Sequence, residues 1–237
     1  MPVTVEIRRA SQGYLTREHG LRTRHAFSFG RHYDPANTGF GPLVCHDDHL
    51  VGSGRGFPDH PHAGVEIVTW VLEGALVHVD STGAAATVTP GTVQVQATGS
   101  GIVHSERASE SGPARFVQAW LAQDDLADDG AEPSYETAAV DLSRGGLVPV
   151  VSGHDPAAPV RLRTANATFS VARLEGGETL TLPEDPLQHV YVTRGTLLRS
   201  SLAEPLSDGD SFRITDQPGL QITAGVRTEL LVWGFGR

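Results

Sequence analysis

The chain has 237 residues, a formal net charge of −10 at pH 7 and a single cysteine, Cys45. Its basic residues form no cluster, so we expect neither nucleic acid nor an anionic membrane surface as a partner. One cysteine excludes an intrachain disulfide, and we expect Cys45 to be an ordinary buried thiol. No apolar run is long enough to cross a bilayer and no signal-peptide pattern follows Met1, so the expected location is cytoplasmic.

Short apolar segments separated by turn residues fill the first half and predict β-strands. We expect strands over residues 21–32, 42–51, 65–72, 75–79, 86–89, 92–97 and 115–121. Clusters of Gly, Pro, Asp and Ser lie between them, and almost no segment has helical periodicity. Short strands with such frequent turns are typical of an all-β sandwich or jelly roll.

The same pattern returns after an acidic connector, residues 122–134, which carries five carboxylates and no basic residue. Here we expect strands over residues 169–174, 179–182, 189–193, 196–200, 211–214, 220–223 and 229–233. The segments LEGALVHVDS and TRGTLLRSSL are weakly similar, which favours an ancestral duplication. We therefore predict an N-terminal barrel over residues 1–130 and a C-terminal barrel over residues 131–237. The second half contains no His-x-His pair, so we expect the N-terminal barrel to bind metal and the C-terminal barrel to be without metal.

Two pairs of potential metal ligands occur at strand spacing in the first half. His60 and His62 lie two residues apart in HPHAGVEIVTWVLEG, and His104 and Glu106 lie two apart in GSGIVHSE. Alternate side chains of a strand point to one face, so each pair would point into a barrel. Three imidazoles and one carboxylate suit a divalent first-row metal such as iron, copper, nickel, manganese or zinc, with positions left for a substrate.

Taken in order, these motifs and the Pro-Gly turn between them resemble the pirin family, most strongly from about Phe27 to Trp120 and including FSFGRHYDP. The resemblance implies a bicupin fold, two jelly-roll β-barrels in tandem. It implies that His60, His62, His104 and Glu106 are the metal ligands. It also implies Fe²⁺ as the usual metal, and quercetin 2,3-dioxygenase activity as found in several members.

Two other side chains remain alternatives. In cupins generally a glutamate shortly after the HxH pair is often the carboxylate ligand, and Glu66 has that place and the parity of the two histidines; the pirin pattern favours Glu106 instead. Glu66 or His78 could also hydrogen-bond a ligating imidazole, and His78 could equally pack in the core. The other histidines we expect to be structural or exposed: His19, His25, His32, His46, His49, His154 and His189.

A divalent metal with three neutral imidazoles and one carboxylate retains about one positive charge and favours an anionic oxygen ligand. A flavonol that loses its 3-hydroxyl proton fits this demand, with Glu106 as the expected proton acceptor. In related quercetinases O₂ then opens the heterocycle with release of carbon monoxide. The alternatives are a dioxygenase for another enolic or catecholic compound, and a non-enzymatic metal- and redox-sensing regulator that binds a partner protein.

Overall fold

The computed structural model describes residues 4–122, 131–198 and 205–236, so residues 123–130 of the predicted acidic connector lie outside it. Apart from one 3₁₀ turn, η1 (Ala10–Gln12), every regular element in these ranges is a β-strand, which confirms the all-β prediction. None of the described residues forms a helix with the length and apolarity to cross a membrane.

The chain forms two compact units. The N-terminal unit comprises Tyr14–Val140, and the C-terminal unit comprises Met1–Gly13 with Asp141–Arg237. These bounds differ from the predicted 1–130 and 131–237 at both ends. Strand β1 (Thr4–Arg8) pairs with β20 in the C-terminal unit, and β12 (Ser134–Ala139) pairs with β9 in the N-terminal unit. Neither strand was among those predicted, and periodicity in any case identifies a strand but not its distant partner.

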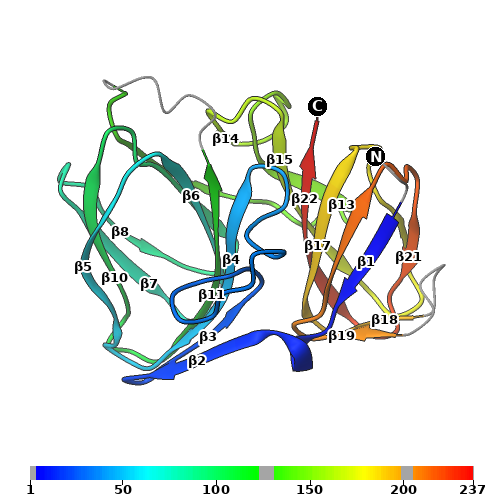
Figure 1. Cartoon of the computed structure of the whole chain (residues 1–237), viewed down its shortest axis with the longest axis horizontal. Coiled ribbons are helices and arrows are strands. Elements are labelled where there is room, and N and C mark those ends of the chain that lie inside the picture. The colour runs from blue at the N-terminus through cyan, green and yellow to red at the C-terminus, as the bar shows by residue number, and fades with distance from the viewer. Residues whose placement is uncertain (1–3, 123–130, 199–204, 237) are drawn as a thin grey trace. The chain divides into compact units, whose positions relative to one another are not determined.

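The N-terminal unit contains two antiparallel sheets, which face each other in Figure 1. The larger has the order β12-β9-β6-β11-β4-β3-β2, and the smaller has the order β5-β10-β7-β8. Their bounds are β2 (Tyr14–Glu18), β3 (Leu21–His25), β4 (Leu43–Val51), β5 (Gly56–His62), β6 (Val65–Glu73), β7 (Leu76–Asp80), β8 (Ala85–Val88), β9 (Thr92–Ala97), β10 (Ile102–Ala108) and β11 (Ala114–Ala122).

The C-terminal unit has a seven-stranded sheet in the order β1-β20-β17-β22-β15-β13-β14 and two small ribbons, β16-β21 and β18-β19. Buried aliphatic side chains and Phe212 fill its interior. The bounds are β13 (Leu147–Ser152), β14 (Val160–Arg161), β15 (Ala167–Leu174), β16 (Thr179–Thr181), β17 (Leu187–Arg194), β18 (Thr196–Leu197), β19 (Leu206–Ser207), β20 (Ser211–Thr215), β21 (Gln221–Thr223) and β22 (Thr228–Phe235).

One departure from the predicted strands affects the site. The strand expected over residues 21–32 ends at His25, because a tight turn follows it. Phe29 and His32 exchange backbone hydrogen bonds of 2.8 and 2.9 Å, and Gly30 adopts φ +54°, a conformation that favours glycine. The turn places the Phe29 ring in a stack on the His25 ring, with centroids 5.2 Å apart.

Candidate metal centre

Adjacent antiparallel strands carry the two predicted ligand pairs. In β5 and β10, His60 lies directly opposite His104. Along β10 the buried positions alternate with more exposed ones, and His104 and Glu106 are both buried while Val103 and Arg107 are exposed. The two-residue spacing therefore turns His104 and Glu106 to the same, inner face of the strand.

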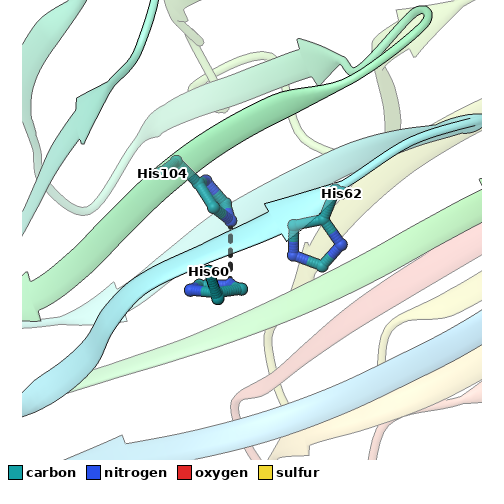
Figure 2. Close-up of side chains that lie close together, drawn as sticks. All are labelled: His60, His62 and His104. Atoms are coloured by element: carbon teal, nitrogen blue, oxygen red, sulfur yellow. Dashed lines mark hydrogen bonds between the residues drawn. The ribbon is translucent and has the colours of Figure 1, made fainter.

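Three imidazoles meet between these strands. His60, His62 and His104 each offer a ring nitrogen, and these atoms lie within 4.8 Å of one another. Figure 2 shows the three rings around a shared space, with Nε2 of His60 and Nε2 of His104 3.0 Å apart. Nδ1 of His60 donates to the Pro58 carbonyl at 2.7 Å, which leaves the lone pair of Nε2 facing His104. The buried Nε2 of His62 has no hydrogen-bond partner among the described residues. This arrangement fits a shared cation.

His62 and His104 are in the protonation state that a metal requires. Burial lowers the pKa of His62 to about 4, and the nearby charge of His60 adds to this effect. Burial likewise lowers the pKa of His104 to about 4. Both rings are therefore neutral near pH 7, and each has a nitrogen lone pair available for coordination.

Glu106 lies beside His104 and belongs to a second group with His78, whose ligand atoms are also within 4.8 Å of one another. One oxygen of its carboxylate accepts a hydrogen bond from Gln94 Nε2 at 2.9 Å, and the other accepts from Gln118 Nε2 at 2.7 Å. Burial alone would raise the pKa of Glu106, but the adjacent His78 ring, the charge of His104 and hydrogen bonds from the two glutamines lower it to about 2. Glu106 is thus an anion whose oxygens keep further lone pairs.

Two aromatic donors orient the glutamine amides. The Trp120 indole donates to Gln118 Oε1 at 3.0 Å, and the Tyr135 hydroxyl donates to Gln94 Oε1 at 3.0 Å. Since each amide oxygen is occupied, each NH₂ group points to Glu106. None of these residues was among the predicted site residues. The signal for Gln94 was present in TVQVQA, where polar side chains alternate onto the inner face of a predicted strand.

His78 lies next to Glu106, with Nδ1 3.7 Å from the carboxylate and Nε2 3.3 Å from Asp80 Oδ2. Its buried ring stacks on Tyr135, with centroids 4.5 Å apart. Burial would lower the pKa of His78, but the two carboxylates raise it. Glu66 is buried too, yet it belongs to neither group of candidate ligands found among the described residues. The geometry therefore favours His78 over Glu66 as a neighbour of the centre.

A pocket of about 460 Å³ leads to this site, and His60 and Glu106 lie in its lining. Phe29, Phe57 and Trp120 form aromatic walls, while β2, β3 and β4 supply a polar wall. That polar wall includes His25 and His49, which we expected to be structural or exposed. The lining also includes Thr16, Glu18, Thr23, Gly30, Arg31, Asp47 and Gln118. Such a lining suits a flat aromatic molecule with polar substituents.

Comparison with known proteins agrees with this geometry. The pirin family model matches residues 5–121. A Mycobacterium tuberculosis protein named "Putative quercetin 2,3-dioxygenase" is 42% identical over 237 residues, covering 98% of this chain and 96% of the relative. A "Pirin-like protein" of Caulobacter vibrioides is 33% identical over 221 residues, covering 91% of this chain and 93% of the relative.

A solved structure is similar along the whole chain. The structure of the bacterial pirin YhhW from Escherichia coli in complex with nickel(II) superposes with a TM-score of 0.88 and 26% identity. The match covers 98% of this chain and 99% of that one. Since both units are included, it confirms the predicted bicupin fold.

Proposed function

The chain belongs to the pirin family, and from that premise we propose that it is a metal-dependent dioxygenase that opens the ring of a flavonol with O₂. One observation carries the proposal: the ring nitrogens of His60, His62 and His104 converge beside a pocket with aromatic walls. The name of the Mycobacterium tuberculosis relative supports quercetin and O₂ as the substrates to test.

We propose His60, His62, His104 and Glu106 as the metal ligands. Three neutral imidazoles and one carboxylate would leave about one positive charge on a divalent ion. Fe²⁺ is the metal that we propose first, and the nickel(II) in the similar Escherichia coli structure makes Ni²⁺ the next to test. When bound, the metal would act as a Lewis acid toward an enolate oxygen and supply the electronic path for the reaction with O₂.

The residues around the ligands would position the reactants. Gln94 and Gln118 hold the Glu106 carboxylate in one orientation. Phe29 and Trp120, whose rings lie edge to face at 5.7 Å, would pack on a flat ligand and exclude water. The role of Glu106 as proton acceptor stays a prediction. Because hydrogen bonds hold the pKa of Glu106 near 2, its carboxylate is a weak base at neutral pH.

Metal analysis combined with a flavonol assay tests this proposal. Anaerobically purified protein is loaded separately with Fe²⁺, Ni²⁺, Mn²⁺, Cu²⁺ or Zn²⁺, and quercetin consumption is followed after O₂ is added. We expect one metal per chain and oxygen-dependent turnover with at least one metal. In a folded His62→Ala variant we expect metal content and turnover to fall by at least about 100-fold. The matched control is His154→Ala, because His154 is an exposed histidine of the C-terminal unit.

Stable protein that leaves quercetin untouched with every metal would overturn the dioxygenase proposal. The regulator hypothesis would then be favoured if metal still binds. In that case, loading should change protection of the backbone amides from hydrogen exchange at the surface of the N-terminal unit. The same metal-loaded samples therefore distinguish the dioxygenase proposal from the regulator hypothesis.

A further inference from the structure

Three polar side chains form a hydrogen-bonded chain in the pocket wall. Asp47 Oδ2 lies 2.8 Å from Nδ1 of His25, and Nε2 of His25 lies 2.9 Å from Thr16 Oγ1. All three residues line the pocket that also contains His60 and Glu106. None of the three belongs to a group of candidate metal ligands in the described part of the chain. The proposed metal centre thus gives no role to these three hydrogen-bonded side chains.

The direction of the first hydrogen bond follows from the donors available. An ionised carboxylate only accepts, so Nδ1 of His25 carries the hydrogen and donates it to Asp47. Nε2 and the Thr16 hydroxyl share the second hydrogen bond, and in either direction of that bond the Thr16 oxygen keeps a lone pair. The Thr16 side chain is only half-buried. Thr16 Oγ1, at the end of this hydrogen-bonded series, is therefore a hydrogen-bond acceptor for a ligand in the pocket.

The position of this acceptor is fixed by strand pairing. His25 lies opposite Asp47 between β3 and β4, and Thr16 lies opposite Thr23 between β2 and β3. The Phe29 ring covers the His25 ring at an interplanar angle of 11°. His25 is 5% exposed and Asp47 is 4% exposed, so the pair is held away from bulk water. A buried, oriented chain of this kind needs little rearrangement to bind a donor.

The acceptor lies away from the metal centre. Gln118, which donates to Glu106, pairs with Asp47 across β11 and β4, and Asp47 pairs with His25 across β4 and β3. Neighbouring strands are about 4.8 Å apart, so His25 lies about 10 Å across the sheet from Gln118. A ligand must be long as well as flat to contact both ends of the pocket.

We propose that the Thr16–His25–Asp47 chain selects ligands that carry a phenolic hydroxyl group remote from the metal-binding end. That hydroxyl donates to Thr16 Oγ1, and the chain relays the polarisation to Asp47. This inference rests on the proposed function and narrows its substrate class to polyhydroxylated flat aromatics. A ligand without the hydroxyl displaces water but leaves the acceptor unpaired, which lowers affinity by about 10- to 100-fold.

Two ligands and four proteins test the proposal. Quercetin has hydroxyl groups on its outer rings, whereas 3-hydroxyflavone keeps the metal-binding hydroxyl and carbonyl but lacks the others. Thr16→Val removes the hydroxyl with little change of shape, and valine is well suited to a strand. Thr87→Val in β8 is the matched control, because Thr87 is exposed and does not line the described pocket. Anaerobic dissociation constants come from quenching of tryptophan fluorescence, and kcat/KM comes from the assay with O₂.

The wild type and Thr87→Val should bind quercetin more tightly than 3-hydroxyflavone. Thr16→Val should reduce this ratio of affinities about tenfold, because only the binding of quercetin is weakened. His25→Gln, a second variant, should reduce it in the same direction. An unchanged ratio of affinities in Thr16→Val overturns the inference. An equal loss of affinity for both ligands also overturns it, because it indicates that Thr16 has only a structural role. If the wild type neither binds nor consumes either flavonol, the proposed function fails and this inference fails with it. If the wild type consumes quercetin but Thr16→Val leaves the preference unaltered, only this inference fails and the proposed function stands.

Discussion

The large sheets of the two units share a strand order but bury different side chains. In the N-terminal unit the first six strands are β12-β9-β6-β11-β4-β3, and in the C-terminal unit the corresponding strands are β1-β20-β17-β22-β15-β13. On the inner face of the N-terminal sheet, Thr69 of β6 lies opposite Gln94 on one side and Gln118 on the other.

The corresponding inner positions of the C-terminal sheet are apolar. Val190 of β17 lies opposite Phe212 on one side and Val232 on the other, and all three are essentially fully buried. They belong to one core cluster of hydrophobic residues. One backbone arrangement thus supports a polar interior around Glu106 in one unit and an ordinary core in the other. The comparison indicates that the site depends on the side chains of the inner face and not on the barrel itself.

A pair of glycines defines the correspondence. Gly74 follows β6 with φ +72°, and Gly195 follows β17 with φ +86°. A Cβ at Gly74 would lie 2.1 Å from the Pro113 carbonyl oxygen, and one at Gly195 would lie 2.4 Å from that of Arg227. Each carbonyl directly precedes the next strand of the sheet, and these glycines fall in the two segments whose weak similarity we noted. A shared constraint of this kind favours an ancestral duplication.

The largest expected effect tests that shared constraint. Gly74→Ala and Gly195→Ala should each destabilise the fold by about 3 kcal/mol or more, because both combine a left-handed φ with a backbone clash. Urea unfolding measures the loss, and hydrogen exchange with mass spectrometry assigns it to a unit. Gly83→Ala is the control: it has φ +90° but no neighbour within 4 Å, so we expect only about 1 kcal/mol. A harmless substitution at Gly74 or at Gly195 would break the correspondence.

The second test places the polar residue of one unit into the other. Val232→Gln puts a glutamine at the C-terminal position that corresponds to Gln118. Its amide would be buried among aliphatic side chains without the partners that Gln118 has, so we expect a loss of about 2 kcal/mol. Urea unfolding measures it, with Val232→Leu as an apolar control. Equal stability of the two variants would mean that the C-terminal interior accepts polar groups, contrary to the comparison.

The reverse substitution tests the polar unit. Gln118→Val removes the amide that donates to Glu106 and accepts from Trp120, and we expect metal affinity to fall about 10- to 100-fold. Metal titration measures the change. Gln188→Val in the C-terminal unit is the matched control, because Gln188 is also buried but its amide donates to backbone carbonyls there. Unaltered affinity in Gln118→Val would show that the glutamine does not support the site.

The smallest effect is an acid sensitivity of the metal-free N-terminal unit. The pKa of His62 is lowered to about 4, below its ordinary value of 6.5. The unfolded chain therefore binds more protons than the folded unit between pH 6.5 and 4, and stability falls as the pH falls through this range. Because His62 is only partly buried, we expect about 1 kcal/mol from this residue. His62→Gln should lose less stability than the wild type between pH 7 and 4.5 in urea unfolding, and an equal loss would count against this cause.

Residue spacing predicted local features of the site well. The alternation of a strand put His104 and Glu106 on one face, and their burial agrees with it. The sequence did not indicate which residues orient Glu106, because Gln94, Gln118 and Tyr135 lie on three different strands. Their relation to Glu106 depends on the pairing of β6 with both β9 and β11, and of β12 with β9.

His25 shows the same limit more sharply. In the sequence it is one of eleven histidines, and nothing close to it marks a partner. In the folded unit it bonds Asp47 and Thr16 across two strand pairs and lies under Phe29. The turn that brings Phe29 there begins where a longer strand was expected, so local periodicity alone pointed to a different role.

The amino-acid sequence by itself determined the all-β class and the pairing of candidate ligands along two strands, because these depend on side-chain type and a period of two residues. It also indicated the family, through the order of its motifs. Only the tertiary structure decided that His60 meets His104, that two glutamines orient Glu106, and that β12 completes the N-terminal unit. Contacts of this kind join residues far apart in the chain, and their geometry is fixed by strand register and packing, which no local pattern contains.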